Sequence, residues 1–299
     1  MEIFEIGFDS LPLENKDIVL CLGFFDGVHL GHQYIVNEAK KEGYPIAVFT
    51  FDNSPAFILG KKRENSALSS VSDRAEYFQE LGVEYMYIMH FDLEASKYTK
   101  DQFIELILKS INPKKIYCGE DFTFGVREDG KPEYLKLFFD VNIIKIQMMD
   151  GEKIAARNIL SAIENGNIKY ANKLLGKPYR VCGLVVKGLQ NGRKIDFPTA
   201  NLKFSFPYAF PKIGVYMGYA DVYGDKYKVL ICVSTHPTLE RLEFPIIEVH
   251  VIDYEGNLYG QEILVEFIDY IRDIITFDSL EELKEQILKD REFVKNQLQ

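Results

Sequence analysis

The feature that most constrains this chain of 299 residues is a change of pattern near residue 150. Before that point, short apolar runs (17–24, 45–51 and 114–119 among them) alternate with stretches that read as helices. Strands that alternate with helices at short spacing predict a doubly wound parallel sheet with right-handed crossovers. Such sheets bind their ligands beyond the carboxyl ends of the strands.

After Pro178 the sequence consists of short strands and turns, such as GVYMGYADVYG (214–224) and PIIEVHVIDYEG (245–256). Many short strands at regular spacing predict a small antiparallel β-barrel. The amphipathic stretch 277–297 then predicts a helix that closes the chain.

The length also favours two domains, since a domain typically takes roughly 100–200 residues. Residues 155–176 read as two short helices broken at Gly166, and the boundary is expected near them. We therefore expect an α/β domain over 1–165 and a barrel domain over 166–299. Residues 151–200 carry nine bases and three acids, which fits either a phosphate-handling surface or a solvated charged helix.

Charge and composition exclude several classes of protein. The formal net charge is −10, which argues against a generally cationic nucleic-acid binder. No apolar run approaches the ~18–20 residues of a membrane helix, and the acidic start does not resemble an export signal. The four cysteines form no C-x-x-C pair, so we expect reduced, buried thiols in a cytoplasmic protein.

The stretch GFFDGVHLGHQ (23–33) lies at a predicted strand-to-helix junction, with His29 and His32 three residues apart. A helix N-terminus offers free N–H groups to an anion, and two imidazoles there would stabilise charge that develops on phosphates. Three glycines allow close backbone approach: Gly23, Gly27 and Gly31. The alternatives are a glycine-rich turn with two surface histidines, or half of a metal site.

The same residues resemble the nucleotidyltransferase superfamily, and the longer string resembles the adenylyltransferase half of bacterial bifunctional riboflavin kinase/FAD synthetases. The run CGEDFTFG (118–125) strengthens the resemblance. The resemblance implies catalytic roles for His29 and His32 and flavin contacts for Phe122 and Phe124. It implies nucleotide binding by Gly23, Phe24, Asp26, Gly27, Gly31 and Asp121. Without the resemblance, the two phenylalanines read as core residues.

A second motif is GLQNGRKIDFPTANL (188–202). The oxygens of Thr199 and Asn201 are hard ligands suited to Mg²⁺, and amides of a loop around Gly192 and Arg193 suit phosphate. The alternative is a turn followed by an edge strand that contains a proline.

The motif is followed, in the order of the riboflavin kinase half of the same family, by PKIGVYMG (211–218), IIEVHVID (246–253), LYGQ (258–261) and YIRDIITFDSLEEL (270–283). The resemblance covers the chain from about residue 17 to 298. It adds nucleotide binding by Lys187, Gly192 and Arg193, with metal binding by Thr199 and Asn201.

Strand alternation in IIEVHVID places Glu248 and His250 on one face, opposite the apolar residues. The resemblance makes Glu248 the base that activates the flavin ribityl 5′-hydroxyl, and it places Arg272 near the flavin. The alternatives are a solvent-facing glutamate and, for Arg272, an ion pair with Asp269 or Asp273.

The sequence departs from the family at phosphate-handling positions. Ser54 stands where the family usually has a histidine, and 154–160 lacks three hydroxyls and an arginine of the family pattern I-S-S-T-x-I-R. Loss of charge-assisted hydrogen bonds weakens a phosphate site. Arg157, which the family pattern lacks at this position, is expected to grip phosphate in compensation. In the barrel half, Asp196 replaces a glycine.

We therefore expect a cytoplasmic flavin enzyme that uses ATP, Mg²⁺, riboflavin and FMN, with no nucleic-acid or membrane partner. The barrel would phosphorylate riboflavin to FMN, and the N-terminal domain would adenylylate FMN to FAD. One alternative keeps only one activity, with the other domain as a scaffold. A second is a flavin- or nucleotide-binding regulator without catalysis.

Overall fold

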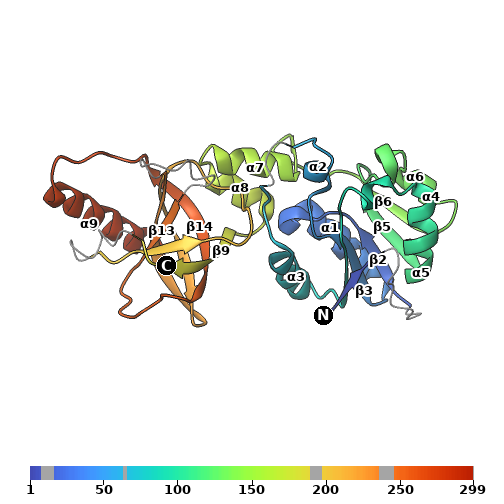
Figure 1. Cartoon of the computed structure of the whole chain (residues 1–299), viewed down its shortest axis with the longest axis horizontal. Helices are drawn as coiled ribbons and strands as arrows, with labels where there is room; N and C mark the ends of the chain where they lie inside the picture. The colour runs from blue at the N-terminus through green and yellow to red at the C-terminus, as the bar shows by residue number, and fades with distance from the viewer. Residues whose placement is uncertain (8–16, 63–65, 189–196, 236–245, 299) are drawn as a thin grey trace. The chain divides into compact units, whose positions relative to one another are not determined.

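The structure is a computed structural model (Figure 1) that describes all residues except 8–16, 63–65, 189–196, 236–245 and 299. The chain forms two compact units, Met1–Ala156 and Arg157–Gln299. The division between the two compact units therefore lies before residue 165. The helical residues that follow this division belong with the barrel, because the Ile163 carbonyl accepts a hydrogen bond from the Lys212 amide at 3.2 Å. The expected domain boundary at 165/166 stays a prediction.

In the described part of the first unit, six parallel strands form a sheet in the order β1-β4-β3-β2-β5-β6. The strands are β1 (Glu2–Ile6), β2 (Val19–Leu22), β3 (Ile46–Phe51), β4 (Tyr85–Met89), β5 (Lys115–Gly119) and β6 (Val141–Ile144). The expected doubly wound sheet is confirmed. From β2 the chain steps through β3 and β4 in one direction and through β5 and β6 in the other. The carboxyl ends of β2 and β5 therefore flank the topological switch point.

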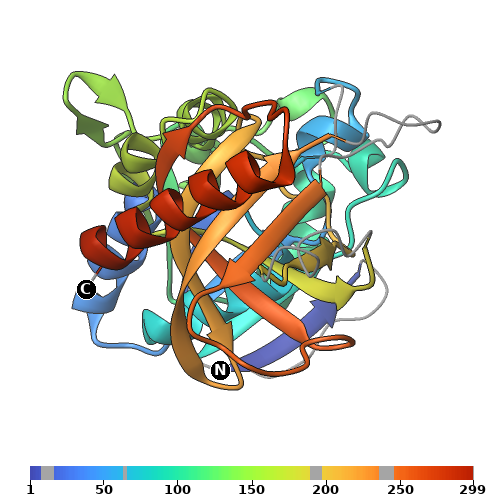
Figure 2. The same cartoon turned by 90° about the vertical axis from the view of Figure 1, so that its left-hand side faces the viewer.

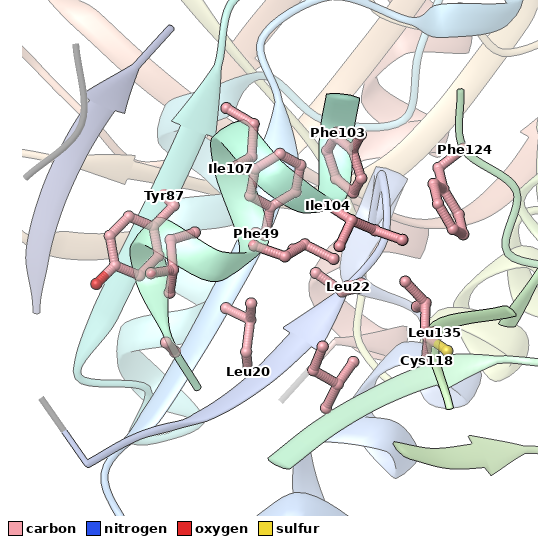
Figure 3. Close-up of a cluster of buried hydrophobic side chains, with 14 of the residues drawn as sticks. Leu20, Leu22, Phe49, Tyr87, Phe103, Ile104, Ile107, Cys118, Phe124 and Leu135 are labelled. Atoms are coloured by element: carbon pink, nitrogen blue, oxygen red, sulfur yellow. The ribbon is translucent and has the colours of Figure 1, made fainter. Parts of the chain in front are cut away.

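A hydrophobic core lies on each face of this sheet, because alternate residues of a strand point to opposite faces. Leu20 and Leu22 pack with Phe49, Phe103 and Ile107 on one face, as Figure 3 shows. Val19 and Cys21 pack on the other face with residues of α1 and α3. The helices of this unit are α1 (Leu30–Ala39), α2 (Pro55–Ile58), α3 (Val71–Glu80), α4 (Lys100–Phe103), α5 (Lys109–Ile111) and α6 (Pro132–Leu135).

Shorter elements join these strands and helices. The 3-10 turns are η1 (Asp26–Val28), η2 (Lys40–Glu42), η3 (Ala95–Lys97) and η5 (Val126–Glu128), and η4 (Ile104–Leu108) is a π-helical segment between α4 and α5. A hairpin of β7 (Met148–Met149) and β8 (Glu152–Lys153) follows β6.

The described strands of the second unit close into a barrel in the order β10-β13-β12-β11-β14-β9. All of these pairings are antiparallel, so the expected barrel is confirmed. The strands are β9 (Tyr179–Val186), β10 (Ala200–Lys203), β11 (Gly214–Val222), β12 (Asp225–Ser234), β13 (Ile246–Val251) and β14 (Glu262–Arg272).

The expected helices accompany the barrel: α7 (Ala156–Glu164), α8 (Ile168–Leu175) and the closing α9 (Leu280–Gln297). Figure 2 shows α9, in red, lying across the outside of the barrel strands. Val294 and Leu298 pack there against Val215, Met217 and Leu230. The outer face of the barrel is thus partly covered by the chain itself.

None of the four cysteines forms a disulfide: Cys21 and Cys118 are buried, whereas Cys182 and Cys232 are only partly buried. The expectation of four buried thiols is therefore wrong for two, because both lie at strand positions that point away from the barrel interior. Across the described residues, we find no helix with the length and apolar character needed to cross a membrane.

Candidate active sites

A cavity of about 440 Å³ opens in the first unit where β2 and β5 end. Its wall includes the residues that follow β2 and those that follow β5, as expected for the switch point of a doubly wound sheet. Nine of the residues to which the resemblance assigns a catalytic, nucleotide or flavin contact line it: Gly23, Phe24, Asp26, His29, Gly31, His32, Asp121, Phe122 and Phe124. The topology thus brings the two halves of the first predicted site together.

His29 and His32 form a stacked pair at the start of α1. His29 is the N-cap residue, and its Nδ1 accepts a hydrogen bond from the His32 amide at 3.4 Å. The ring centroids are 3.5 Å apart, with 17° between the planes. Because Nδ1 of His29 accepts a hydrogen bond, the neutral ring carries its hydrogen on Nε2. A Cβ at Gly31 would lie 3.2 Å from the His29 ring, so glycine leaves room for this stacking.

The turn between β2 and α1 is held in an unusual backbone conformation. Phe25, Gly27 and Val28 all have positive φ angles, of 57°, 70° and 42°. Such a conformation costs roughly 1–3 kcal/mol at a non-glycine residue and persists only where the surroundings enforce it. Burial enforces it here, because Phe25 and Val28 are 1% and 0% exposed.

Asp26 contributes to the same turn through its carboxylate. Its Oδ1 accepts hydrogen bonds from the amides of Leu68 and Ser69 at 2.9 and 3.1 Å, and the Ser69 hydroxyl lies at 3.2 Å. Burial raises the pKa of Asp26. The Gly27 amide donates to the Ser69 hydroxyl at 2.7 Å. Asp26 lines the cavity, but this oxygen anchors the turn to the segment before α3.

Arg74 of α3 is a buried cation that we did not single out from the sequence. Its guanidinium donates to the carbonyls of Phe24 and Phe51 at 2.7 and 2.8 Å and to the Thr50 hydroxyl at 2.5 Å. The side chain therefore links the carboxyl ends of β2 and β3. Burial lowers the pKa of Arg74 to about 10. The spacing in the sequence could have indicated this burial. Arg74 precedes Tyr77 by three residues and Phe78 by four, so all three share one face of the helix.

Two phenylalanines, Phe122 and Phe124, lie on the side of the cavity that follows β5. The rings of Phe122 and Phe124 stack with centroids 5.8 Å apart, and Phe124 lies 5.5 Å from Phe103. Phe124 is 5% exposed, so it belongs to the hydrophobic core as well as to the cavity wall. The interpretation of Phe124 as a core residue is therefore compatible with its predicted contact with the flavin.

In the barrel, strand register brings a second set of predicted residues together. Asn201 of β10 is directly opposite Glu248 of β13, and Glu248 is also opposite Cys232 of β12. Residues opposite each other project from the same face of a sheet. Ile247 and Val249 are buried in the barrel, so these three side chains lie on the outer face. The predicted alternation of IIEVHVID is confirmed.

Thr199 and His250 lie beside these three side chains, and we call the five residues the outer-face row. Thr199 directly precedes β10 and is partly buried. The His250 Nδ1 lies 2.9 Å from the Pro198 carbonyl, and burial lowers the pKa of this histidine. A Cβ at Gly188 would overlap the Asn201 side chain, so the chain after β9 approaches the row closely.

Two family models match this chain, one for each unit. Residues 11–162 match the model described as FAD synthetase, and residues 175–298 match that described as riboflavin kinase. A Listeria monocytogenes protein named bifunctional riboflavin kinase/FMN adenylyltransferase is 34% identical over 92% of this chain and 90% of its own length. This chain belongs to the same bifunctional family.

Other relatives agree along most of the chain. The Bacillus subtilis protein of the same name is 34% identical over 93% of this chain and 92% of its own length. A solved Streptococcus pneumoniae structure named as a macrolide-efflux protein is 32% identical, with a TM-score of 0.90 over 99% of both chains. That name differs from those of the curated relatives, while its fold and sequence agree with this family.

Some of the positions where this chain departs from the family pattern also lie in the cavity wall. Ser54, Ala155 and Ala156 line it. Arg157 is exposed and belongs to the second unit. Its expected contact with phosphate stays a prediction.

Arg272 is held by an ion pair, although not with either aspartate considered from the sequence. Its Nη2 lies 2.6 Å from Oδ2 of Asp290 on α9, and its Nη1 donates to the Asp273 carbonyl at 3.0 Å. The Asp269 and Asp273 carboxylates pair instead with Lys169 and Lys212. The flavin contact of Arg272 stays a prediction. Gly192, Arg193 and Asp196 lie outside the described residues, and Lys187 is exposed.

Proposed function

We propose that this chain makes FMN from riboflavin on its barrel and FAD from FMN in its N-terminal cavity, using ATP in both reactions. The observation that carries the proposal is that each matched half contains its own convergent site. The stacked histidines lie at the switch-point cavity, and Glu248 lies beside Asn201 on the barrel. The names and coverage of the relatives support the same two activities.

On the barrel, Glu248 is the proposed general base. It would accept the proton of the riboflavin 5′-hydroxyl while that oxygen bonds to the γ-phosphorus of ATP and the bond to ADP breaks. A carboxylate on the outer face, next to a polar Asn201, is accessible to such a hydroxyl.

The donor set in the same row fits Mg²⁺. The hydroxyl of Thr199 and the amide oxygen of Asn201 are hard oxygen ligands, and Mg²⁺ commonly keeps waters and phosphate oxygens as its other ligands. Within the described ranges, no group of three or more His, Cys, Asp or Glu side chains forms a metal site. We assign Thr199 and Asn201 as the residues that would hold the ion, which neutralises phosphate charge when bound.

In the cavity, the FMN phosphate would bond to the α-phosphorus of ATP as pyrophosphate leaves. The His29–His32 pair and the N-terminus of α1 would stabilise the negative charge that develops on the phosphates. Aromatic side chains such as Phe122 would contact the flavin. We also propose that Arg157 contributes to holding phosphate, in place of the hydroxyl groups that the family has and this chain lacks.

A single assay tests the two activities. The full chain is incubated with riboflavin, ATP and Mg²⁺, and separately with FMN, ATP and Mg²⁺, and the flavins are separated by chromatography. We expect FMN and FAD from the first mixture and FAD from the second. Formation of only one product would leave one unit as a scaffold. A flavin that is bound but unchanged in both mixtures would make the chain a regulator.

A further inference from the structure

Of the two proposed metal ligands, Asn201 lies within β10, whereas Thr199 directly precedes this strand. The pairing of β10 with β13 runs from Leu202 opposite Ile247 to Ala200 opposite Val249. One further step along this register places Thr199 opposite His250. Pro198 has no N–H group with which to extend a ladder. The backbone pairing of β10 with β13 ends at Ala200, so it does not include Thr199.

The side chain of His250 forms a hydrogen bond to Pro198, the residue that precedes Thr199. Its Nδ1 lies 2.9 Å from the Pro198 carbonyl, which can only accept, so Nδ1 must carry a hydrogen. Both the neutral Nδ1–H tautomer and the protonated ring can donate this bond.

The same ring also contacts the residue before the proline. The His250 ring packs edge-on against Phe197, with centroids 5.3 Å apart, and Phe197 is 3% exposed. Arg291 of α9 lies 5.7 Å from the centre of the Phe197 ring. Phe197 and Pro198 are thus both held against β13 immediately before Thr199.

We infer that His250 is a positioning residue for the barrel reaction, whose hydrogen bond to the Pro198 carbonyl fixes the place of the Thr199 hydroxyl. The inference rests on the proposed function of Thr199 as a magnesium ligand. A partner that orients a metal ligand typically changes metal affinity or activity by about 10–100-fold. His250 would act through Thr199 and would not touch the substrates.

Two variants separate the hydrogen bond from the mere presence of a side chain. His250→Leu removes the donor, whereas the amide nitrogen of His250→Asn takes nearly the place of Nδ1. We expect His250→Leu to raise the Mg²⁺ concentration for half-maximal FMN formation by about tenfold or more. The KM for riboflavin should change by less than about twofold, and His250→Asn should restore most of the Mg²⁺ response. FAD formation from added FMN, in the same samples, should stay at the wild-type rate.

A binding measurement provides a second readout. Mn²⁺ is titrated into the full chain in the presence of ADP and followed by electron paramagnetic resonance, and Thr199→Val identifies the barrel site. We expect His250→Leu to weaken the same binding step as Thr199→Val. The double variant should be no weaker than Thr199→Val alone, because the histidine acts through the threonine.

The outcomes separate the inference from the proposed function. If Thr199→Val weakens Mn²⁺ binding and His250→Leu does not, the positioning role is wrong while the metal site stands. A failure of His250→Asn to restore the response would make His250 a packing residue and overturn the inference. If Thr199→Val changes neither binding nor FMN formation, the proposed metal site is wrong and the inference falls with it.

Discussion

The two candidate sites are assembled by different physical means. In the first unit, the cavity lies where parallel strands end, and its residues come from turns such as Phe24–His32 with positive φ angles. On the barrel, the candidate residues lie along the faces of paired strands, and the register alone makes Asn201 and Glu248 neighbours. The first site therefore depends on what supports its turns, whereas the second depends on strand pairing.

Two arginines show the same contrast. Arg74 donates to the carbonyls of Phe24 and Phe51, so its charge holds the backbone of the cavity. Arg272 in the barrel pairs with the buried carboxylate of Asp290 and so holds α9 to β14. Removing Arg74, which bonds the backbone of the site itself, should therefore reduce activity more than removing Arg272, which joins a helix to a strand.

The largest expected effect breaks the support of the cavity. Arg74→Met would leave the Phe24 and Phe51 carbonyls, at the ends of β2 and β3, without their donor, and we expect a loss of about 3–5 kcal/mol in the free energy of unfolding. FAD formation from FMN should fall, while FMN formation from riboflavin persists under conditions where the chain stays folded. Urea unfolding and the two flavin assays measure these effects.

The matched control removes a charge of the same sign from the surface of the same unit. Lys97→Met breaks only an exposed pair with Glu94 and should leave stability and both activities near wild type. If Arg74→Met behaved like Lys97→Met, the contrast between the two kinds of support would be wrong.

The next effect concerns chemistry on the barrel. Glu248→Gln keeps the shape and the strand pairing but removes the proposed base, so FMN formation should fall by ~10²-fold or more. Riboflavin binding and FAD formation from FMN should persist, because neither needs this carboxylate. Single-turnover assays and flavin binding measure the two quantities. A variant that makes FMN at the wild-type rate would return Glu248 to an ordinary surface residue.

The fold was accessible from the sequence because both halves have strong periodicity. Alternation in IIEVHVID correctly separated Glu248 and His250 from the buried Ile247, Val249 and Val251. The strand β1 (Glu2–Ile6) was not among the expected strands, because MEIFEIGF mixes charged and apolar residues in a short terminal run. Its pairing with β4 is a tertiary contact that no local pattern contains.

The sites were accessible only in part, because the sequence names residues without naming what they bond. The motif at 23–33 predicted His29 and His32 at a helix start, yet not that His29 would cap the helix and stack on His32. The motif predicts that Asp26 binds nucleotide, which stays a prediction, but it did not indicate that Asp26 Oδ1 accepts hydrogen bonds from amides more than forty residues away. The sequence did not indicate that Arg74 is buried, because a charged residue within a helix usually lies in solvent.

One histidine from each unit gives the smallest and sharpest comparison, because the pKa values of His90 and His250 shift in opposite directions. His90 follows β4 and lies 2.5 Å from the Asp52 carboxylate, whose hydrogen bond raises the pKa of His90. In the barrel, burial lowers the pKa of His250. The Asp52 carboxylate also accepts the amide of Phe91 at 2.9 Å, and Phe91 lines the cavity.

The sign of the pH dependence follows from proton binding. His90 binds its proton more tightly in the folded chain, so its stabilisation is complete below the unfolded pKa of about 6.5 and is lost as pH rises through the raised folded value. His250 contributes in the opposite sense, since its stabilisation is complete above about 6.5 and is lost as pH falls through the lowered folded value. His90→Asn should therefore cost more stability at pH 5.5 than at pH 8.5.

The expected size of the His90 effect is small. The side chain is 66% exposed, and an exposed ion pair typically contributes only ~0.2–1 kcal/mol. Urea unfolding of wild type, His90→Asn and Asp52→Asn at the two pH values measures it, and Asp52→Asn should remove the same pH-dependent part. Because the pair adjoins Phe91, His90→Asn should also change FAD formation more at the lower pH and leave FMN formation unaffected. An equal loss of stability at both pH values would mean that His90 contributes through contacts that do not depend on its charge, and the contrast between the two units would then rest on Arg74 and Arg272 alone.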